Sequence, residues 1–174
     1  MTTATAPGHG DAAIALDRLA HTIGLSLPPG ISGTTARIAG VTADSRAVAP
    51  GFLFAALPGS RSDGRAHIGD AVARGAVAVL APEGTAWPEG VPARPLLAAP
   101  DARRALSLAA AAFHGAQPEV LVAVTGTNGK TSTVDFLRQT WTLAGRRAAS
   151  LGTLGLVAEG FPPGPSLTTP DPVT

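Results

Sequence analysis

The sequence feature that most constrains the fold is the stretch Glu119–Ser132, which reads EVLVAVTGTNGKTS. Its first half, Val120–Val124, is a short apolar run rich in valine, which is typical of a buried strand in a parallel sheet. Its second half is a turn with two glycines that ends in Gly-Lys-Thr. The residues behind it predict a helix over 133–144, with apolar side chains at helical spacing: Val134, Leu137, Trp141 and Ala144. Strand, glycine-bearing turn and helix in this order are the context of a phosphate-binding loop.

The residue types in the turn suit that chemistry. Glycines at 126 and 129 let the backbone adopt positive φ and approach phosphate oxygens closely, and N–H groups at a helix start point at an anion. A lysine can reach the β- and γ-phosphates, and a threonine hydroxyl can ligate Mg²⁺. The candidate nucleotide-binding residues are therefore Gly126, Thr127, Asn128, Gly129, Lys130, Thr131 and Ser132. Among them Lys130 is the catalytic candidate and Thr131 the metal-ligand candidate.

This loop departs from the usual GxxxxGK[ST] pattern, because Val124 stands where that pattern has its first glycine. The alternative interpretation of residues 126–131 is a surface turn with a threonine as the helix cap. The flanking apolar run and helical pattern favour phosphate binding.

Composition excludes several classes of function. The net charge of +1, with 14% charged residues, gives no basic surface for nucleic acid. The absence of cysteine excludes disulfides and thiolate metal sites, and the four histidines lack the spacing of a zinc site. No segment is apolar for long enough to cross a membrane, and the first residues do not resemble a signal peptide. We therefore expect a cytoplasmic protein without nucleic-acid or membrane partners.

Predicted strands and helices alternate along the chain, which indicates an α/β fold. The predicted helices cover 11–23, 66–74, 101–113 and 133–144, and the predicted strands lie within 31–43 and at 52–57, 76–80, 96–98, 120–124 and 147–151. Residues 1–10 are predicted to be a disordered lead, 11–116 a first domain and 117–174 the beginning of a second. A phosphate-loop domain needs further strands to complete its sheet, so we expect a truncated domain.

Several separate motifs carry a family resemblance over residues 38–174. They are VTADSR at 41–46, GFLFAALPG at 51–59, SDG at 62–64, TGTNGKTS at 125–132, GTLG at 152–155 and LTTP at 167–170. With these motifs the sequence resembles the Mur ligases, and within them the members that add the third residue of the peptidoglycan stem peptide. Ala123 replaces a glycine that is often found there. Alone, Asp44-Ser45-Arg46 predicts only a turn in which Asp44 accepts backbone N–H groups and Arg46 pairs with it.

The resemblance implies a small N-terminal α/β uridine-nucleotide-binding domain, followed by the start of a P-loop parallel-sheet ATP-binding domain. It implies an ATP- and Mg²⁺-dependent amide ligase that adds a diamino acid, meso-diaminopimelate or L-lysine, to UDP-MurNAc-L-Ala-D-Glu through an acyl phosphate. The residues that it implies for binding the UDP-MurNAc-peptide are Ala43, Ser45, Ser60, Arg61, Ser62, Thr168 and Thr169. We expect a monomer. The family's amino-acid-selecting domain and modified lysine have no counterpart in this sequence, so we expect the chain alone to be inactive in ligation.

Three alternatives stay open at this point. The first is the sister ligase that adds the terminal dipeptide, although we would not expect it to show GTLG followed by LTTP. The second is a non-catalytic module that binds a nucleotide or a UDP-sugar. The third is an unrelated phosphate-loop GTPase or kinase, against which the ordered motifs of residues 41–64 argue.

Overall fold

A computed structural model describes residues 13–27, 36–59, 62–162 and 173 of the 174-residue chain. The predicted lead over 1–10 and the first two residues of the helix predicted over 11–23 lie outside these residues. The chain divides into two compact units, one formed mainly by Gly10–Gln117 and the other mainly by Pro118–Pro172. Among the helices that the structure describes, none is both long and apolar enough to span a membrane.

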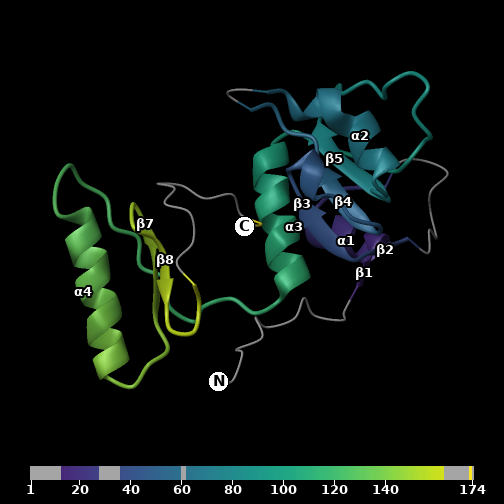
Figure 1. Cartoon of the computed structure of the whole chain (residues 1–174). Helices are drawn as coiled ribbons and strands as arrows, with labels where there is room; N and C mark the ends of the chain where they lie inside the picture. Colours follow the sequence, from purple (N-terminus) through teal and green to yellow (C-terminus); the bar gives the residue numbers. More distant parts are fainter. Residues whose placement is uncertain (1–12, 28–35, 60–61, 163–172, 174) are drawn as a thin grey trace. The chain divides into compact units, whose positions relative to one another are not determined.

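The first unit is organised around a four-stranded sheet in which every neighbouring pair of strands is parallel (Figure 1). Its strands, in spatial order, are β3 (Gly40–Thr42), β4 (Phe52–Ala55), β5 (Ala78–Pro82) and β6 (Leu96–Ala99). Sequential parallel strands need crossovers between them, and the chain provides these with short helical segments and the proline-rich loop before β6. The α/β fold with a parallel sheet is confirmed.

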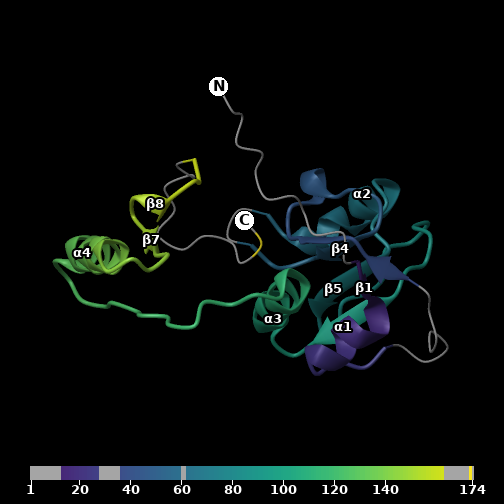
Figure 2. The same ribbon diagram turned by 90° about the horizontal axis from the view of Figure 1, so that it is seen from below.

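Helices cover both faces of this sheet, as Figure 2 shows. On one face, Leu53 and Ala55 of β4 pack in a cluster with α1 (Leu16–Thr22) and α3 (Ala102–His114). On the other face, Phe54 packs in a second cluster with α2 (Ile68–Ala73). Because successive residues of a strand point to opposite faces, a strand covered on both sides has to be apolar throughout, which explains the unbroken run at 52–57.

The first helix is shorter than predicted. It begins at Leu16, because the residues before it, β1 (Ile14–Ala15), pair with β2 (Arg37–Ile38) in a small antiparallel sheet. The Leu16 N–H also donates to the Ala36 carbonyl at 3.0 Å. The helix prediction over 11–23 was therefore wrong at its amino-terminal end, since pairing with residues 22 and 24 positions later cannot be recognised from local propensity.

The helix predicted over 66–74 is divided in two. A 3₁₀ turn, η2 (Gly64–His67), precedes α2 (Ile68–Ala73). The Asp63 carboxylate fixes this turn by accepting the Arg65 N–H at 3.0 Å. A similar turn, η1 (Ser45–Ala47), follows β3.

The second unit contains α4 (Lys130–Leu143) and a hairpin of β7 (Ala149–Gly152) and β8 (Gly155–Ala158). The two strands are antiparallel, with Ser150 opposite Val157 and a two-residue turn of Thr153 and Leu154. The first strand, predicted over 147–151, begins two residues later than predicted, and β8 was not predicted. A two-residue segment closed by glycine is a recognisable hairpin signal.

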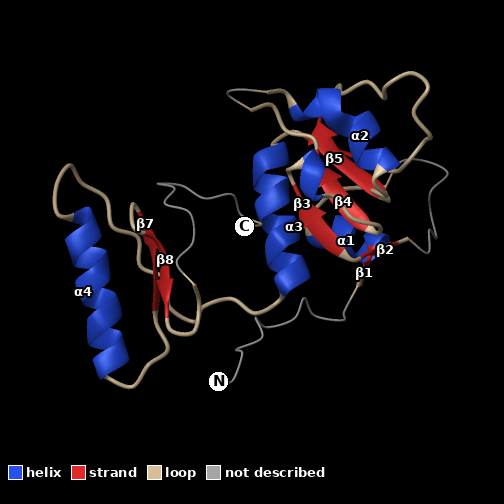
Figure 3. Cartoon of the chain, viewed as in Figure 1, coloured by secondary structure: helices blue, strands red, loops and turns tan. Residues whose placement is uncertain are grey.

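The strand predicted over Val120–Val124 is absent, and Figure 3 shows this segment as loop. Leu121 is 85% exposed, and Val120 and Val122 are about half exposed. A strand requires a hydrogen-bonded neighbour, and no described strand pairs with this segment. The predicted face of α4 is only half-buried at Val134, Leu137 and Trp141, and Ala144 is exposed. An open hollow of about 560 Å³ lies between this face, the 120–124 segment and the hairpin.

A matched pair of substitutions on α3 tests the packing of the first unit. Leu106 is 1% exposed, whereas Leu108, two residues later, is 38% exposed. We expect Leu106→Ala to lower the free energy of unfolding by about 2–5 kcal/mol, because it leaves a cavity in the core. Leu108→Ala should change it by less than about 1 kcal/mol. Urea unfolding in a Trp141→Phe background, followed by the fluorescence of Trp87, reports on the first unit alone. Equal destabilisation by both substitutions would contradict this packing.

Candidate nucleotide-binding site

The glycines of the 125–132 loop occupy backbone conformations that other residues rarely adopt. Gly129, the N-cap of α4, has φ of 75° in the left-handed region, and Gly126 has φ of 144°. A side chain at either position would strain the backbone. These two glycines therefore set the path by which the chain enters α4.

The amino-terminal end of α4 presents unpaired backbone donors. Gly129 has no side chain that could cap the helix, and the first intrahelical bond runs from the Thr133 N–H to the Gly129 carbonyl at 2.9 Å. The N–H groups of residues 130–132 precede this ladder, so they have no acceptor within the helix. Together with the positive end of the helix dipole, they form a place where a phosphate group can bind.

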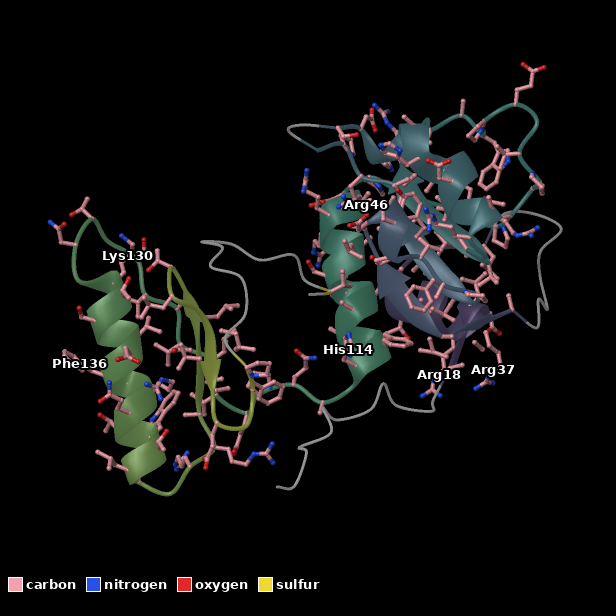
Figure 4. The ribbon with its side chains drawn as sticks, in the orientation of Figure 1. Arg18, Arg37, Arg46, His114, Lys130 and Phe136 are labelled. Atoms are coloured by element: carbon pink, nitrogen blue, oxygen red, sulfur yellow. The ribbon has the colours of Figure 1, made fainter. Side chains whose placement is uncertain are left out.

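Lys130, the only lysine in the sequence, lies at this end of α4 (Figure 4). Its side chain folds back over its own loop, and its Nζ donates to the Gly126 carbonyl at 2.5 Å and lies 3.4 Å from the Thr127 carbonyl. A hydrogen bond to an anionic phosphate oxygen is stronger than one to a neutral carbonyl. The ammonium group can therefore exchange its loop contacts for a phosphate without leaving the site.

Thr131 joins the loop to the hairpin. Its hydroxyl lies 2.9 Å from the hydroxyl of Thr153, in the turn between β7 and β8. A cavity of about 190 Å³ adjoins this contact, lined by Val124, Lys130, Thr131, Val134, Asp135 and residues 150–155. The structure thus brings two of the predicted loop residues together with the predicted GTLG segment.

Asp135 is the carboxylate that borders this cavity. It accepts hydrogen bonds from Arg138 at 2.7 Å and from Gln139 at 2.6 Å. The hydrogen bond from Arg138, and secondarily that from Gln139, lowers the pKa of Asp135. These contacts hold the carboxylate ionised and engaged on its own helix, which does not suit it to act as a proton acceptor.

The donor set at this end of α4 fits Mg²⁺ held together with a nucleotide. No group of three or more His, Asp or Glu side chains within the described ranges could hold a metal ion without a further ligand. Magnesium usually keeps several waters and is bound by few protein ligands plus substrate phosphates. A single threonine hydroxyl beside a candidate phosphate site is compatible with this coordination preference.

A second group of predicted residues lies at the carboxyl end of β3 in the first unit. Asp44 accepts the Arg46 N–H at 2.9 Å and forms an ion pair with the Arg46 guanidinium at 2.8 Å. These hydrogen bonds from Arg46 lower the pKa of Asp44 to about 2. The turn predicted from Asp44-Ser45-Arg46 alone is thereby confirmed, and it leaves Ala43 and Ser45 half-buried beside it.

The same arrangement recurs after β4, which the sequence analysis missed. Asp63 accepts the Arg65 N–H at 3.0 Å and pairs with its guanidinium at 2.5 Å, so that the pKa of Asp63 falls to about 2. The repeated Asp-x-Arg spacing was the signal that could have revealed it. Gly64 is required between them, because a Cβ there would lie 2.7 Å from the Leu57 carbonyl oxygen. The carboxyl ends of parallel strands form one edge of a sheet, where ligands of open α/β folds bind.

The remaining predicted residues divide into two groups. Ser62 is exposed next to this second turn, and its hydroxyl lies 2.9 Å from His67 Nε2. Ser60, Arg61, Thr168 and Thr169 lie outside the described residues. Binding of a UDP-sugar peptide by these positions stays a prediction.

Comparison with known proteins identifies similar families and relatives. The profile of the Mur ligase family, catalytic domain, matches residues 37–127, and that of the Mur ligase middle domain matches residues 124–174. The UDP-N-acetylmuramoyl-L-alanyl-D-glutamate–2,6-diaminopimelate ligase of Rhizobium meliloti (strain 1021) is 54% identical over 140 residues, which are 80% of this chain and 28% of that protein. The ligase with the same name from Caulobacter vibrioides is 58% identical over 140 residues, 77% of this chain and 28% of that protein.

The chain thus spans about 28% of the length of these curated relatives. Among solved structures, one titled as a UDP-N-acetylmuramoyl-L-alanyl-D-glutamate–2,6-diaminopimelate ligase superposes with a TM-score of 0.64 at 23% identity. That match covers 85% of this chain and 29% of the solved one. At this identity it shows the similarity of the fold.

The Asp44–Arg46 pair gives a pH prediction. Because the folded-state pKa of Asp44 is depressed to about 2, its ionised form is favoured at every pH above that value and lost as the pH falls through it. Arg46→Ala should raise the pKa of Asp44 toward its usual value near 3.8, as measured by NMR titration of the carboxyl carbon. Asp63 is the control and should keep its pKa near 2 in the same variant. An unchanged Asp44 titration would exclude Arg46 as the cause.

The single lysine gives a direct test of phosphate binding. We expect MgATP to slow the acylation of Lys130 by an amine-reactive ester, because bound phosphate engages the ammonium group. At a concentration about twice the dissociation constant, mass action predicts a reduction of about threefold. Mass spectrometry of peptides measures the rate at Lys130, and the amino-terminal amine of the same chain is the internal control. Equal rates at Lys130 with and without saturating MgATP would contradict the assignment.

Proposed function

The chain belongs to the Mur ligase family, and we propose that it forms the amino-terminal part of an ATP-dependent ligase. This ligase would join a diamino acid to UDP-MurNAc-L-Ala-D-Glu in the synthesis of a peptidoglycan precursor. The observation that carries the proposal is the phosphate-binding geometry at the start of α4, where Gly129, Lys130 and the following N–H groups converge. The identities of 54% and 58% to relatives named as such ligases support the choice of substrate.

The chemistry to be explained is the approach of a carboxylate to a polyphosphate. When bound, ATP supplies the γ-phosphoryl group, and Mg²⁺ neutralises phosphate charge. The backbone N–H groups of residues 130–132 would hold phosphate oxygens, and the Lys130 ammonium group, now on the Gly126 carbonyl, would bind the β/γ-phosphates. Thr131 would offer a hydroxyl lone pair to the metal. With charge and position provided, the D-glutamyl carboxylate displaces ADP to give an acyl phosphate, and the amine then displaces phosphate and loses a proton.

Each unit has its own role in this proposal. We assign residues 11–116 to binding the uridine-nucleotide end, with Ala43, Ser45 and the segment 60–62 as its contacts. Residues 117–174 begin the ATP-binding domain, in which Thr168 and Thr169 contact the muramoyl-peptide end. A location in the cytoplasm fits the proposal, because ATP and nucleotide-linked precursors are present there, and we propose that the protein is a monomer.

We propose meso-diaminopimelate rather than L-lysine as the added amino acid. The relatives with identities of 54% and 58% are both named as 2,6-diaminopimelate ligases. The same names argue against the sister ligase that adds the terminal dipeptide. A non-catalytic nucleotide-binding module is the outcome to be expected if the gene ends at codon 174.

The first experiment is to read the DNA downstream of codon 174 and to produce the full-length protein. We expect phosphate release from ATP that requires both UDP-MurNAc-L-Ala-D-Glu and diaminopimelate. Lys130→Ala should lower kcat/KM by at least about 100-fold, because it removes a charge that stabilises the transferring phosphoryl group. Arg94→Ala removes one exposed cation of the first unit and serves as the control. Undiminished turnover of the Lys130→Ala protein would refute the proposed role of the loop. Turnover with L-lysine but not with diaminopimelate would refute the proposed choice of amino acid.

A further inference from the structure

The hydroxyl contact between Thr131 and Thr153 connects two parts of the second unit that are 22 residues apart in sequence. Thr131 lies in the first turn of α4, and Thr153 lies in the turn of the β7–β8 hairpin. The contact is 2.9 Å long, and both residues border the 190 Å³ cavity together with Lys130. This side-chain hydrogen bond ties the start of α4 to the hairpin.

A threonine hydroxyl has one proton to donate and two lone pairs to offer. If the Thr131 oxygen gives a lone pair to a cation, its proton has to point away from that cation and toward an acceptor. The Thr153 oxygen is within reach to accept it. The hairpin holds this acceptor in place, because the strands on either side of its turn are paired. The pairing runs from Ala149 opposite Ala158 to Gly152 opposite Gly155.

We propose that Thr153 is a positioning residue, which accepts the Thr131 proton and thereby directs the Thr131 lone pair toward Mg²⁺. This inference rests on the proposed function, in which Thr131 binds the metal of MgATP. It adds a coupling between two elements of the site: the hairpin turn, which lines the same cavity as Lys130 and Thr131, sets the metal affinity of the loop. Partners of this kind typically contribute about 10- to 100-fold in metal affinity.

Two other threonines of α4, Thr140 and Thr142, show why this contact is distinct. The hydroxyls of Thr140 and Thr142 donate to carbonyls of their own helix, those of Phe136 and Arg138, at 2.8 and 3.0 Å. Such bonds lie within one helix and do not connect it to another element. Thr140→Val is therefore a matched control, because it removes a hydroxyl from the same helix without touching the loop.

The test measures ATP binding by calorimetry in the full-length protein as a function of the free Mg²⁺ concentration. Thr153→Val keeps the shape of the side chain and removes its hydroxyl. We expect the Mg²⁺ concentration for half-maximal enhancement of ATP affinity to rise about tenfold in this variant. Affinity for ATP without Mg²⁺ should be unchanged, and Thr153→Ser, which restores the hydroxyl, should return to the unsubstituted value. Thr140→Val should match the unsubstituted protein throughout.

Two results would overturn the inference alone. One is an unchanged Mg²⁺ dependence in Thr153→Val; the other is an equal loss of ATP affinity with and without Mg²⁺ in both Thr153 variants, which indicates a merely structural role. A different result would show that the proposed function itself is wrong. If the unsubstituted full-length protein shows no Mg²⁺-dependent ATP binding, both the function and the inference are wrong.

Discussion

The structure depends on one requirement, that a parallel strand be hydrogen-bonded to neighbours and covered on both faces. The first unit meets this requirement within itself. Leu53 and Phe54 are adjacent in β4, point to opposite faces and are each 0% exposed, because helices pack on both sides. The segment Val120–Val124 has the composition of such a strand and none of its pairing, so its side chains stay exposed. The two units therefore differ in burial: Leu53 and Phe54 of the first unit are buried, whereas most of the apolar run of the second unit is exposed.

This difference explains what could be predicted from the sequence. Elements fixed by local chemistry were found where expected: α3 begins after Asp101, whose carboxylate accepts the Arg104 N–H at 2.9 Å, and β4 follows the Pro-Gly turn. Elements fixed by pairing were missed or misplaced. Ile14 belongs to a strand only because Ile38 lies opposite, and nothing in residues 11–23 shows this. The 120–124 run was predicted to be a strand from its composition alone, and composition does not show whether another strand lies beside it to pair with.

The site shows the same division. The conformation of the 125–132 loop is local: a left-handed Gly129, a helix that starts at Lys130 and a lysine that reaches the Gly126 carbonyl. These features form although residues 120–124 before them make no strand, because none of the features requires one. Residue identity and spacing could therefore reveal the loop. The Asp63–Arg65 turn was equally local, and its repetition of the Asp44–Arg46 spacing was simply not recognised.

The contact between Thr131 and Thr153 could not have been predicted in this way. Threonine hydroxyls are common on helices and in turns, and most bond to nearby backbone, as those of Thr140 and Thr142 do. Only the folding of the hairpin against α4 brings position 153 to the loop. Under the proposed function, the site has to bring together a carboxylate and a polyphosphate whose charges repel, so the position of the nucleotide matters only when the second substrate is also in place. The Thr131 and Thr153 hydroxyls link the two elements through a single hydrogen bond, so the geometry of one element depends on the other.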